Sequence, residues 1–274
     1  MVVEHIGLSY PMRFGLSYDP FLKNHKECFV ETDDAREALH RLNLLADTKG
    51  FGLLTGEPGT GKTTVIRNWC RSLNPSLFKV VYSSLSTLTV IEFYRNIALG
   101  LGLQPAFRKV DNFHLIQDEI TRLWSERRIT PVFVVDEANH ICSDIFSDFK
   151  ILFNFEMDSQ DRSVVLIAGL PQIFHTLRLS SQEALRQRIV LNCSIDGINK
   201  AEGRTYIEAH LRHAGATHPV FEENAIEALL NRANGVPRVL NSLCSRSLII
   251  ADRRGKSAVD ADTALAAIDD CELS

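Results

Sequence analysis

The chain has 274 residues, 45% of them hydrophobic, with 30 Lys and Arg against 34 Asp and Glu and a formal charge of -4. This length is enough for about two domains, and the near-average composition excludes disordered, collagen-like and coiled-coil proteins. The small acidic excess excludes a globally basic nucleic-acid coat but leaves room for a local basic patch.

The sequence carries no sign of membrane insertion or secretion. Its apolar runs, such as residues 164–170, fall short of the roughly 18 residues that span a bilayer, and the first residues lack the features of a signal peptide. The six cysteines lie far apart with no C-x-x-C pair, which is typical of reduced thiols and not of a disulfide framework or a zinc site. We therefore expect a cytoplasmic protein that does not contact a membrane.

In chain order, residues 1–30 have no regular pattern, and an amphipathic stretch then predicts a helix at 33–47. Short apolar, β-branched runs predict buried parallel strands. The predicted strands span 51–55, 78–83, 131–135, 164–168 and 189–195, and the predicted helices among them span 63–72, 89–101 and 112–127. Between the last two helices we expect a loop that contains the basic pair Arg108 and Lys109.

Strands that alternate with helices predict an α/β fold of three αβα layers around a parallel five-stranded sheet. Strand signals end near residue 197, and four helical stretches follow near 199–213, 222–234, 238–253 and 260–270. The predicted organisation is an irregular N-terminal segment at 1–30, an αβα domain at 31–197 and a small all-helical domain at 198–274.

A phosphate-binding loop follows the first predicted strand and opens the next helix. The segment matches the pattern G-x-x-x-x-G-K-[ST] at every required position. Backbone N–H groups of such a loop surround a phosphate, the Lys62 ammonium can reach the β- and γ-phosphates, and the Thr63 hydroxyl can ligate Mg²⁺. We expect ATP with Mg²⁺ as ligands, and nucleotide contacts from Gly56, Glu57, Pro58, Gly59, Thr60, Gly61, Lys62, Thr63 and Thr64.

Two acidic residues, Asp136 and Glu137, follow the apolar strand at 131–135. At the carboxyl end of a parallel strand beside the phosphate-binding loop, Asp136 would complete the Mg²⁺ site together with Thr63. Glu137 would orient and deprotonate the attacking water. A general base at this position predicts a hydrolase, an ATPase that forms ADP and phosphate.

From about residue 12 to 270, the chain resembles the AAA+ ATPases, and within them the ExeA-like branch, which includes the TniB, TnsC and IstB-like regulators of transposition. The resemblance rests on the loop and the acidic pair described above and on four further segments. These are the segment 14–21, the sequence Ala-Gly-Leu-Pro at 168–171, the segment 184–189 with two arginines, and Gly-Val-Pro-Arg at 235–238.

The resemblance implies roles for three arginines. Arg186 or Arg188 would be an arginine finger that acts on the ATP of a neighbouring subunit, which implies a homo-oligomeric ring or filament. The two are two positions apart and cannot both point the same way, and we favour Arg188. Arg238 would contact the nucleotide from the helical lid. The position that usually holds a polar sensor holds Leu170, with Gln172 two residues later. Either Gln172 substitutes for the sensor or sensing of the γ-phosphate is weak at this point, and the departure predicts slow or assembly-stimulated hydrolysis.

The resemblance also implies duplex DNA as a partner. In regulators of this branch, loops after the second strand follow the DNA backbone, and the matching residues here are Ser86, Thr87, Arg108 and Lys109. Hydroxyl and basic side chains bind phosphates without reading base sequence. The alternative is an ordinary solvated loop.

The predicted function is an ATP-dependent regulator that assembles on DNA and couples target-site selection to a transposase, with a transposase and a target-selector protein as partners. One alternative is a secretion-associated ATPase of the ExeA type. Proteins of that type continue into a membrane span and a cell-wall-binding region, which this sequence does not contain, and we therefore favour the DNA regulator. The other alternative is a nucleotide-gated adaptor with little turnover.

Overall fold

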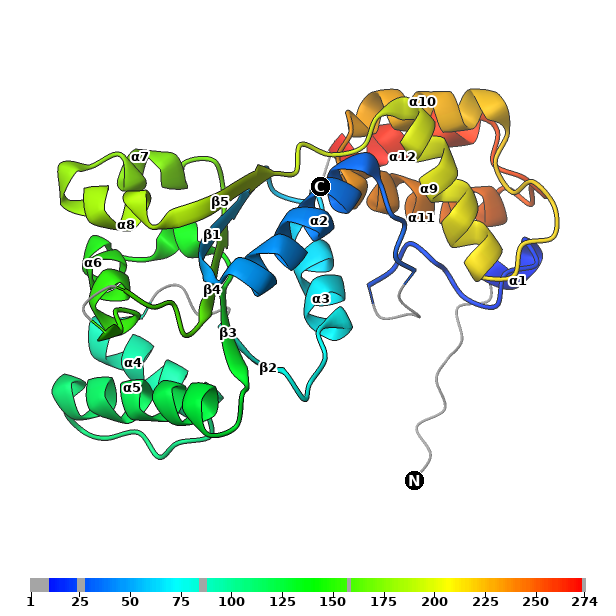
Figure 1. Cartoon of the computed structure of the whole chain (residues 1–274). Coiled ribbons are helices and arrows are strands. Elements are labelled where there is room, and N and C mark those ends of the chain that lie inside the picture. Colours follow the sequence, from blue (N-terminus) through cyan, green and yellow to red (C-terminus); the bar gives the residue numbers. More distant parts are fainter. Residues whose placement is uncertain (1–9, 24–27, 84–87, 157–158, 273–274) are drawn as a thin grey trace. The chain divides into compact units, whose positions relative to one another are not determined.

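A computed structural model of the chain describes residues 10–23, 28–83, 88–156 and 159–272 (Figure 1). The chain divides into two compact units. An αβ unit consists of Asp33–Pro58 and Lys62–Ile195, and a helical unit consists of the chain up to Thr32, the short piece Gly59–Gly61 and the chain from Asp196 onward. Each unit is described by itself below.

The αβ unit is built on a five-stranded parallel sheet with the order β2-β3-β4-β1-β5. The strands are β1 (Gly50–Thr55), β2 (Phe78–Ser83), β3 (Thr130–Val135), β4 (Val164–Gly169) and β5 (Ile189–Ser194). Every residue of β1, β3 and β4 is buried, as expected for strands covered by helices on both faces. The predicted α/β fold with a parallel five-stranded sheet is confirmed.

Helices cover both faces of this sheet, with α2 and α3 on one side and α4, α5 and α6 on the other (Figure 1). Their bounds are α2 (Asp33–Thr48), α3 (Lys62–Ser72), α4 (Val90–Gly100), α5 (Lys109–Ser125), α6 (Ser143–Leu152), α7 (Ile173–Leu177) and α8 (Glu183–Gln187), with 3-10 turns at Ala138–His140 and Ser180–Gln182. The helix α4 begins with a capping box, in which Thr89 and Glu92 satisfy each other's backbone N–H groups. The helices α6, α7 and α8 were not predicted from the sequence.

Aromatic side chains fill much of the core between the sheet and α4 and α6. The ring of Phe133 in β3 lies 4.9 Å from that of Phe153, and the rings of Phe93 and Phe149 are 5.3 Å apart. All four are essentially inaccessible to solvent. Burial of such large apolar side chains is the main source of stability for this face of the sheet.

The helical unit contains the four helices predicted in the second half of the chain. They are α9 (Lys200–His213), α10 (Glu223–Ala233), α11 (Pro237–Arg253) and α12 (Ala261–Glu272). The helix α9 begins with a capping box formed by Asn199 and Glu202, and α11 begins with Pro237, whose fixed φ suits a first helical position. Within the part of the chain that the structure describes, no helix is long and apolar enough to cross a bilayer.

The segment before α2 is part of the helical unit's core, although its sequence has no regular pattern. It begins with a short helix, α1 (Tyr10–Arg13). The Asp19 carboxylate is fully buried, and it accepts hydrogen bonds from the hydroxyls of Tyr10 (2.6 Å) and Ser245 (2.5 Å) and from the Phe21 backbone N–H (2.8 Å). The Phe21 ring stacks on His210 of α9. These contacts join the first described residues to α9 and α11.

Candidate functional site

The phosphate-binding loop connects β1 to α3, as the motif requires. Gly59 and Gly61 have φ values of 86° and 111°, which residues with side chains rarely adopt. No atom lies within 4 Å of a Cβ built on Gly61, so its backbone conformation and not crowding requires glycine there. The open, glycine-shaped loop before a helix N-terminus fits a bound phosphate group.

The Lys62 ammonium is held by the carbonyl groups of its own loop. Lys62 is the first residue of α3, and its Nζ donates to the carbonyl oxygens of Gly56 (2.7 Å) and Glu57 (3.0 Å). The residue is only 6% exposed. A buried cation at the helix N-terminus is a suitable partner for the β- and γ-phosphates of ATP, and Thr64 follows in the same helical turn.

Asp136 connects the phosphate-binding loop and the start of α3 to the end of β3. It follows β3, is 2% exposed, and its Oδ2 accepts hydrogen bonds from the hydroxyls of Thr63 (2.8 Å) and Tyr82 (3.0 Å). Its Oδ1 accepts from the Glu137 backbone N–H (2.9 Å). When the Thr63 hydroxyl donates its proton to Asp136, its oxygen lone pairs stay available for a metal ion.

Hydroxyl and carboxylate oxygens are the ligands that Mg²⁺ prefers, so this donor set fits the expected cofactor. Thr63 would hold the ion directly, and Asp136 would orient Thr63 and complete the surrounding shell. A bound Mg²⁺ supplies positive charge that stabilises the negative charge of the phosphates during hydrolysis.

Tyr82 is a member of this site that the sequence analysis missed. It lies near the carboxyl end of β2, opposite Val134 of β3, which places its hydroxyl beside the carboxylate that follows β3. Burial, together with the nearby Asp136 carboxylate, raises the pKa of Tyr82 to about 12. The phenol therefore remains a hydrogen-bond donor to Asp136 at neutral pH. Its position near the end of a neighbouring strand was the available sequence signal.

Glu137 occupies a strained turn directly after Asp136. Its φ of 54° and ψ of 36° lie in the left-handed region, which is unusual for a residue with a side chain. The side chain is exposed, in contrast to the buried Asp136. Strained backbone of this kind is common where a catalytic side chain must be held in one place.

The polar side chain beside the end of β4 is that of Asn139, whereas the sequence analysis considered Gln172. Gln172 precedes α7 and is exposed, and Leu170 is half-buried. The side-chain oxygen of Asn139, three residues after Asp136, accepts a 3.4 Å hydrogen bond from the Leu170 backbone N–H. The absence of a side chain on Gly169 allows Asn139 to lie this close.

The two candidate finger arginines have different surroundings. Arg188 follows α8, and its guanidinium donates to the carbonyl oxygens of Lys150 (3.0 Å) and Phe153 (2.9 Å) and lies 3.5 Å from the Asp161 carboxylate. Its side chain is 16% exposed. The Arg186 side chain is exposed, with a single 3.4 Å contact to the Leu177 carbonyl oxygen. The geometry thus gives Arg188 an internal structural role and leaves Arg186 facing solvent.

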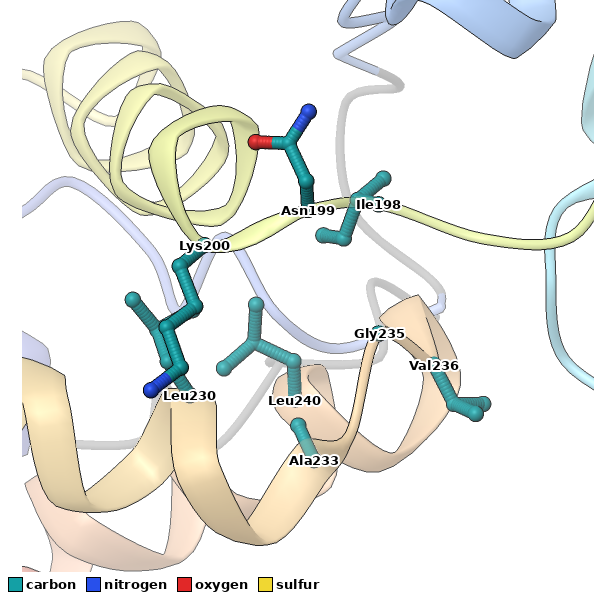
Figure 2. A pocket seen from close by; sticks show the side chains of 8 residues that line it. All are labelled: Ile198, Asn199, Lys200, Leu230, Ala233, Gly235, Val236 and Leu240. Carbon is teal, nitrogen blue, oxygen red and sulfur yellow. The ribbon is translucent and has the colours of Figure 1, made fainter.

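Arg238 is the second residue of α11 in the helical unit. The start of this helix borders a small, largely apolar pocket, which Figure 2 shows in close view. The pocket is lined by Ile198, Asn199, Lys200, Leu230, Ala233, Gly235, Val236 and Leu240. A hydrogen bond from the Ile198 N–H to the Gly235 carbonyl oxygen (2.9 Å) fixes the segment before α9 against the turn that precedes α11.

The residues predicted to contact DNA are only partly described. Ser86 and Thr87 lie outside the described residues. The prediction that Lys109 lies in a loop is wrong, because Lys109 is the first residue of α5 and Arg108 is its N-cap. The Lys109 ammonium forms an ion pair with Asp148 of α6 (2.7 Å). Arg108 is exposed.

Comparisons with known proteins agree with this geometry. Residues 45–177 match the AAA_22 family, described as an AAA domain. General secretion pathway protein A of Aeromonas hydrophila is 33% identical over 265 residues, which cover 94% of this chain and 48% of that protein. ATP-dependent target DNA activator B of Escherichia phage D108 is 21% identical over 236 residues, covering 83% of this chain and 69% of the phage protein.

A solved structure shows the same fold. The crystal structure of Cdc6p from Pyrobaculum aerophilum superposes with a TM-score of 0.69 at 19% sequence identity, covering 88% of this chain and 67% of that one. The comparisons confirm the resemblance to the ExeA-like branch of AAA+ ATPases. Over residues 45–177 the chain is similar to AAA domains, and it spans about half the length of the secretion protein that it matches.

The site geometry predicts that binding and turnover can be separated by substitution. Glu137→Gln keeps the size of the side chain and removes the expected base, so ATP binding is expected to persist while turnover falls by about 100-fold or more. Lys62→Ala removes the cation that faces the phosphates and is expected to abolish binding. Fluorescent-nucleotide titration and phosphate release measure the two effects. Parental turnover in Glu137→Gln would remove Glu137 from the role of base.

Proposed function

We propose that this ATPase is a DNA-bound regulator of transposition, which assembles on duplex DNA when ATP is bound and couples target-site selection to a transposase. The observation that carries the proposal is the hydrogen-bonded Thr63–Asp136 pair with Glu137 beside it, in a chain similar along 83% of its length to a phage target DNA activator. Such a site makes assembly depend on the state of the nucleotide.

In the proposed mechanism, the loop after β1 and Lys62 bind the phosphates, and Asp136 keeps the Thr63 hydroxyl oriented. Glu137 accepts the proton of the attacking water. Its left-handed backbone conformation fixes the direction in which the side chain leaves the chain. Arg238 is proposed as a further ligand of the nucleotide. The apolar Leu170 at the end of β4 supports slow turnover, which suits a switch that holds ATP.

For assembly, we propose Arg186 as the finger that reaches the ATP of a neighbouring subunit. Support comes from its exposure and from the internal contacts that occupy Arg188. A finger in trans makes each active site the product of two subunits, because one supplies the phosphate-binding loop and the other the stabilising charge. ATP therefore favours a ring or filament.

For DNA, we propose Arg108 as a phosphate ligand. It is exposed at the start of α5, whereas the charge of the adjacent Lys109 is balanced by Asp148. One such contact is weak by itself. Repeated once per subunit along a duplex, the contacts add up to an avidity that a single copy cannot supply.

Two observations favour other functions. The 33% identity to general secretion pathway protein A supports a secretion-associated ATPase. Leu170 in place of a polar sensor supports an adaptor with little turnover. Phosphate release with and without duplex DNA separates the three functions: stimulation by DNA supports the regulator, DNA-independent turnover the secretion ATPase, and negligible turnover in both conditions the adaptor.

We expect Arg186 to control turnover and Arg188 to control the stability of the folded protein. Arg186→Ala should keep the folded state and monomer ATP binding, but lose assembly-stimulated turnover by about 1000-fold. Arg188→Ala leaves two carbonyl groups without their donor and should lower the free energy of unfolding by about 2 kcal/mol. Phosphate release at several protein concentrations and thermal unfolding separate the effects. Concentration-dependent turnover that survives in Arg186→Ala would exclude it as the finger.

DNA binding is expected to require ATP, to be nearly independent of base sequence, and to weaken steeply with salt as counterions are released. Arg108→Ala should reduce both the affinity and the salt slope, while Arg127→Ala, just beyond the other end of α5, should change neither. Both arginines are exposed. The measurement is a duplex titration at several salt concentrations with and without a slowly hydrolysed ATP analogue. Binding that is absent in both cases, or equally tight without nucleotide, contradicts the proposed function.

A further inference from the structure

The turn between α4 and α5 exposes an aromatic side chain to solvent. Phe107 is 84% exposed, the highest value for any large apolar side chain among the described residues. Burying a phenylalanine is worth about 1.5–3 kcal/mol, so an exposed one gives up stability that another position could have gained. The exposed ring is therefore available for contact with a partner.

The turn that holds Phe107 is rigid. Asn112 is fully buried, accepts a hydrogen bond from the Ala106 N–H (2.9 Å), and donates to the carbonyl oxygens of Ala106 (3.0 Å) and Arg108 (2.9 Å). Arg95 donates to the carbonyl oxygens of Ala106 (3.2 Å) and Phe107 (3.1 Å). The backbone on both sides of the exposed ring is thus fixed by side chains from α4 and α5, which lowers the entropy that binding would cost.

The charge around the ring is positive. The Arg95 guanidinium lies 5.6 Å from the centre of the Phe107 ring, and the exposed Arg108 follows in sequence. Lys109 does not add to this charge, because it is paired with Asp148. A rigid apolar side chain beside an arginine combines a group that can enter a base step with a cation for the neighbouring phosphate.

We propose that Phe107 inserts at a base step of duplex DNA, while Arg108 binds the adjacent phosphate. This inference rests on the proposed function and adds a contact with the bases to a surface otherwise expected to bind only the backbone. Insertion partly unstacks the step, and it costs least at flexible pyrimidine–purine steps. Bound DNA is therefore deformed at each inserted step, and the protein has a mild preference for deformable sequences.

The test uses the full chain with a slowly hydrolysed ATP analogue and a duplex that contains 2-aminopurine, whose fluorescence rises when its base unstacks. We expect the wild-type protein to raise this fluorescence. Phe107→Ala should abolish the rise and weaken duplex binding by about tenfold, the loss typical of one aromatic–base contact. Phe107→Trp should retain both properties. Leu179→Ala, which truncates another exposed apolar side chain (51%), should behave as wild type.

The outcomes separate this inference from the proposed function. If the wild-type protein binds no DNA, both fail. If it binds duplex but Phe107→Ala binds equally well with the same fluorescence, the insertion is wrong and the DNA-bound regulator stands. Loss of ATP-driven assembly without DNA in Phe107→Ala would assign the ring to a contact between subunits and overturn the inference. An affinity loss seen only with single-stranded DNA would also overturn it, because the ring would then stack on unpaired bases.

Discussion

The hydrogen bond between the Thr63 hydroxyl and the Asp136 carboxylate is the interaction on which the site depends. It joins the first turn of α3, the helix that follows β1, to the end of β3, and β1 and β3 are separated in the sheet by β4. Lys62 precedes Thr63 and Glu137 follows Asp136, so this one contact also fixes the distance between the cation for the phosphates and the proposed base. Tyr82 donates to the same carboxylate oxygen and restricts it further.

Some basic side chains are held by internal contacts, and others are exposed. The Arg188 guanidinium is held by two carbonyl groups, and the Lys109 ammonium is held by Asp148. Arg186 and Arg108 are exposed, and each lies within two positions of one of these paired cations. The charge pattern of the sequence does not reveal which basic side chains are paired, because their partners, such as Asp148, lie far away along the chain.

The sequence was most informative where a local pattern has a single structural meaning. The apolar runs at 51–55 and 131–135 became buried strands, and the glycines of the loop after 55 have the backbone angles that the motif requires. Helices of five residues such as α7 and α8 have little intrinsic stability and depend on tertiary packing, so periodicity did not predict them. The buried Asp19 carboxylate is hydrogen-bonded by Ser245, 226 positions away, and local sequence patterns could not predict this contact either.

The coupling between Thr63 and Asp136 is measured most directly by a double-mutant cycle on kcat/KM for ATP. Thr63→Val removes the hydroxyl at nearly constant volume, Asp136→Asn removes the carboxylate charge, and Thr63→Ser restores the hydroxyl as a control. If the hydrogen bond organises the site, the double variant loses little more activity than the more impaired single variant, with a coupling energy of about 1–3 kcal/mol. Losses that simply add would mean that the two residues act independently, and would contradict the central role of this contact.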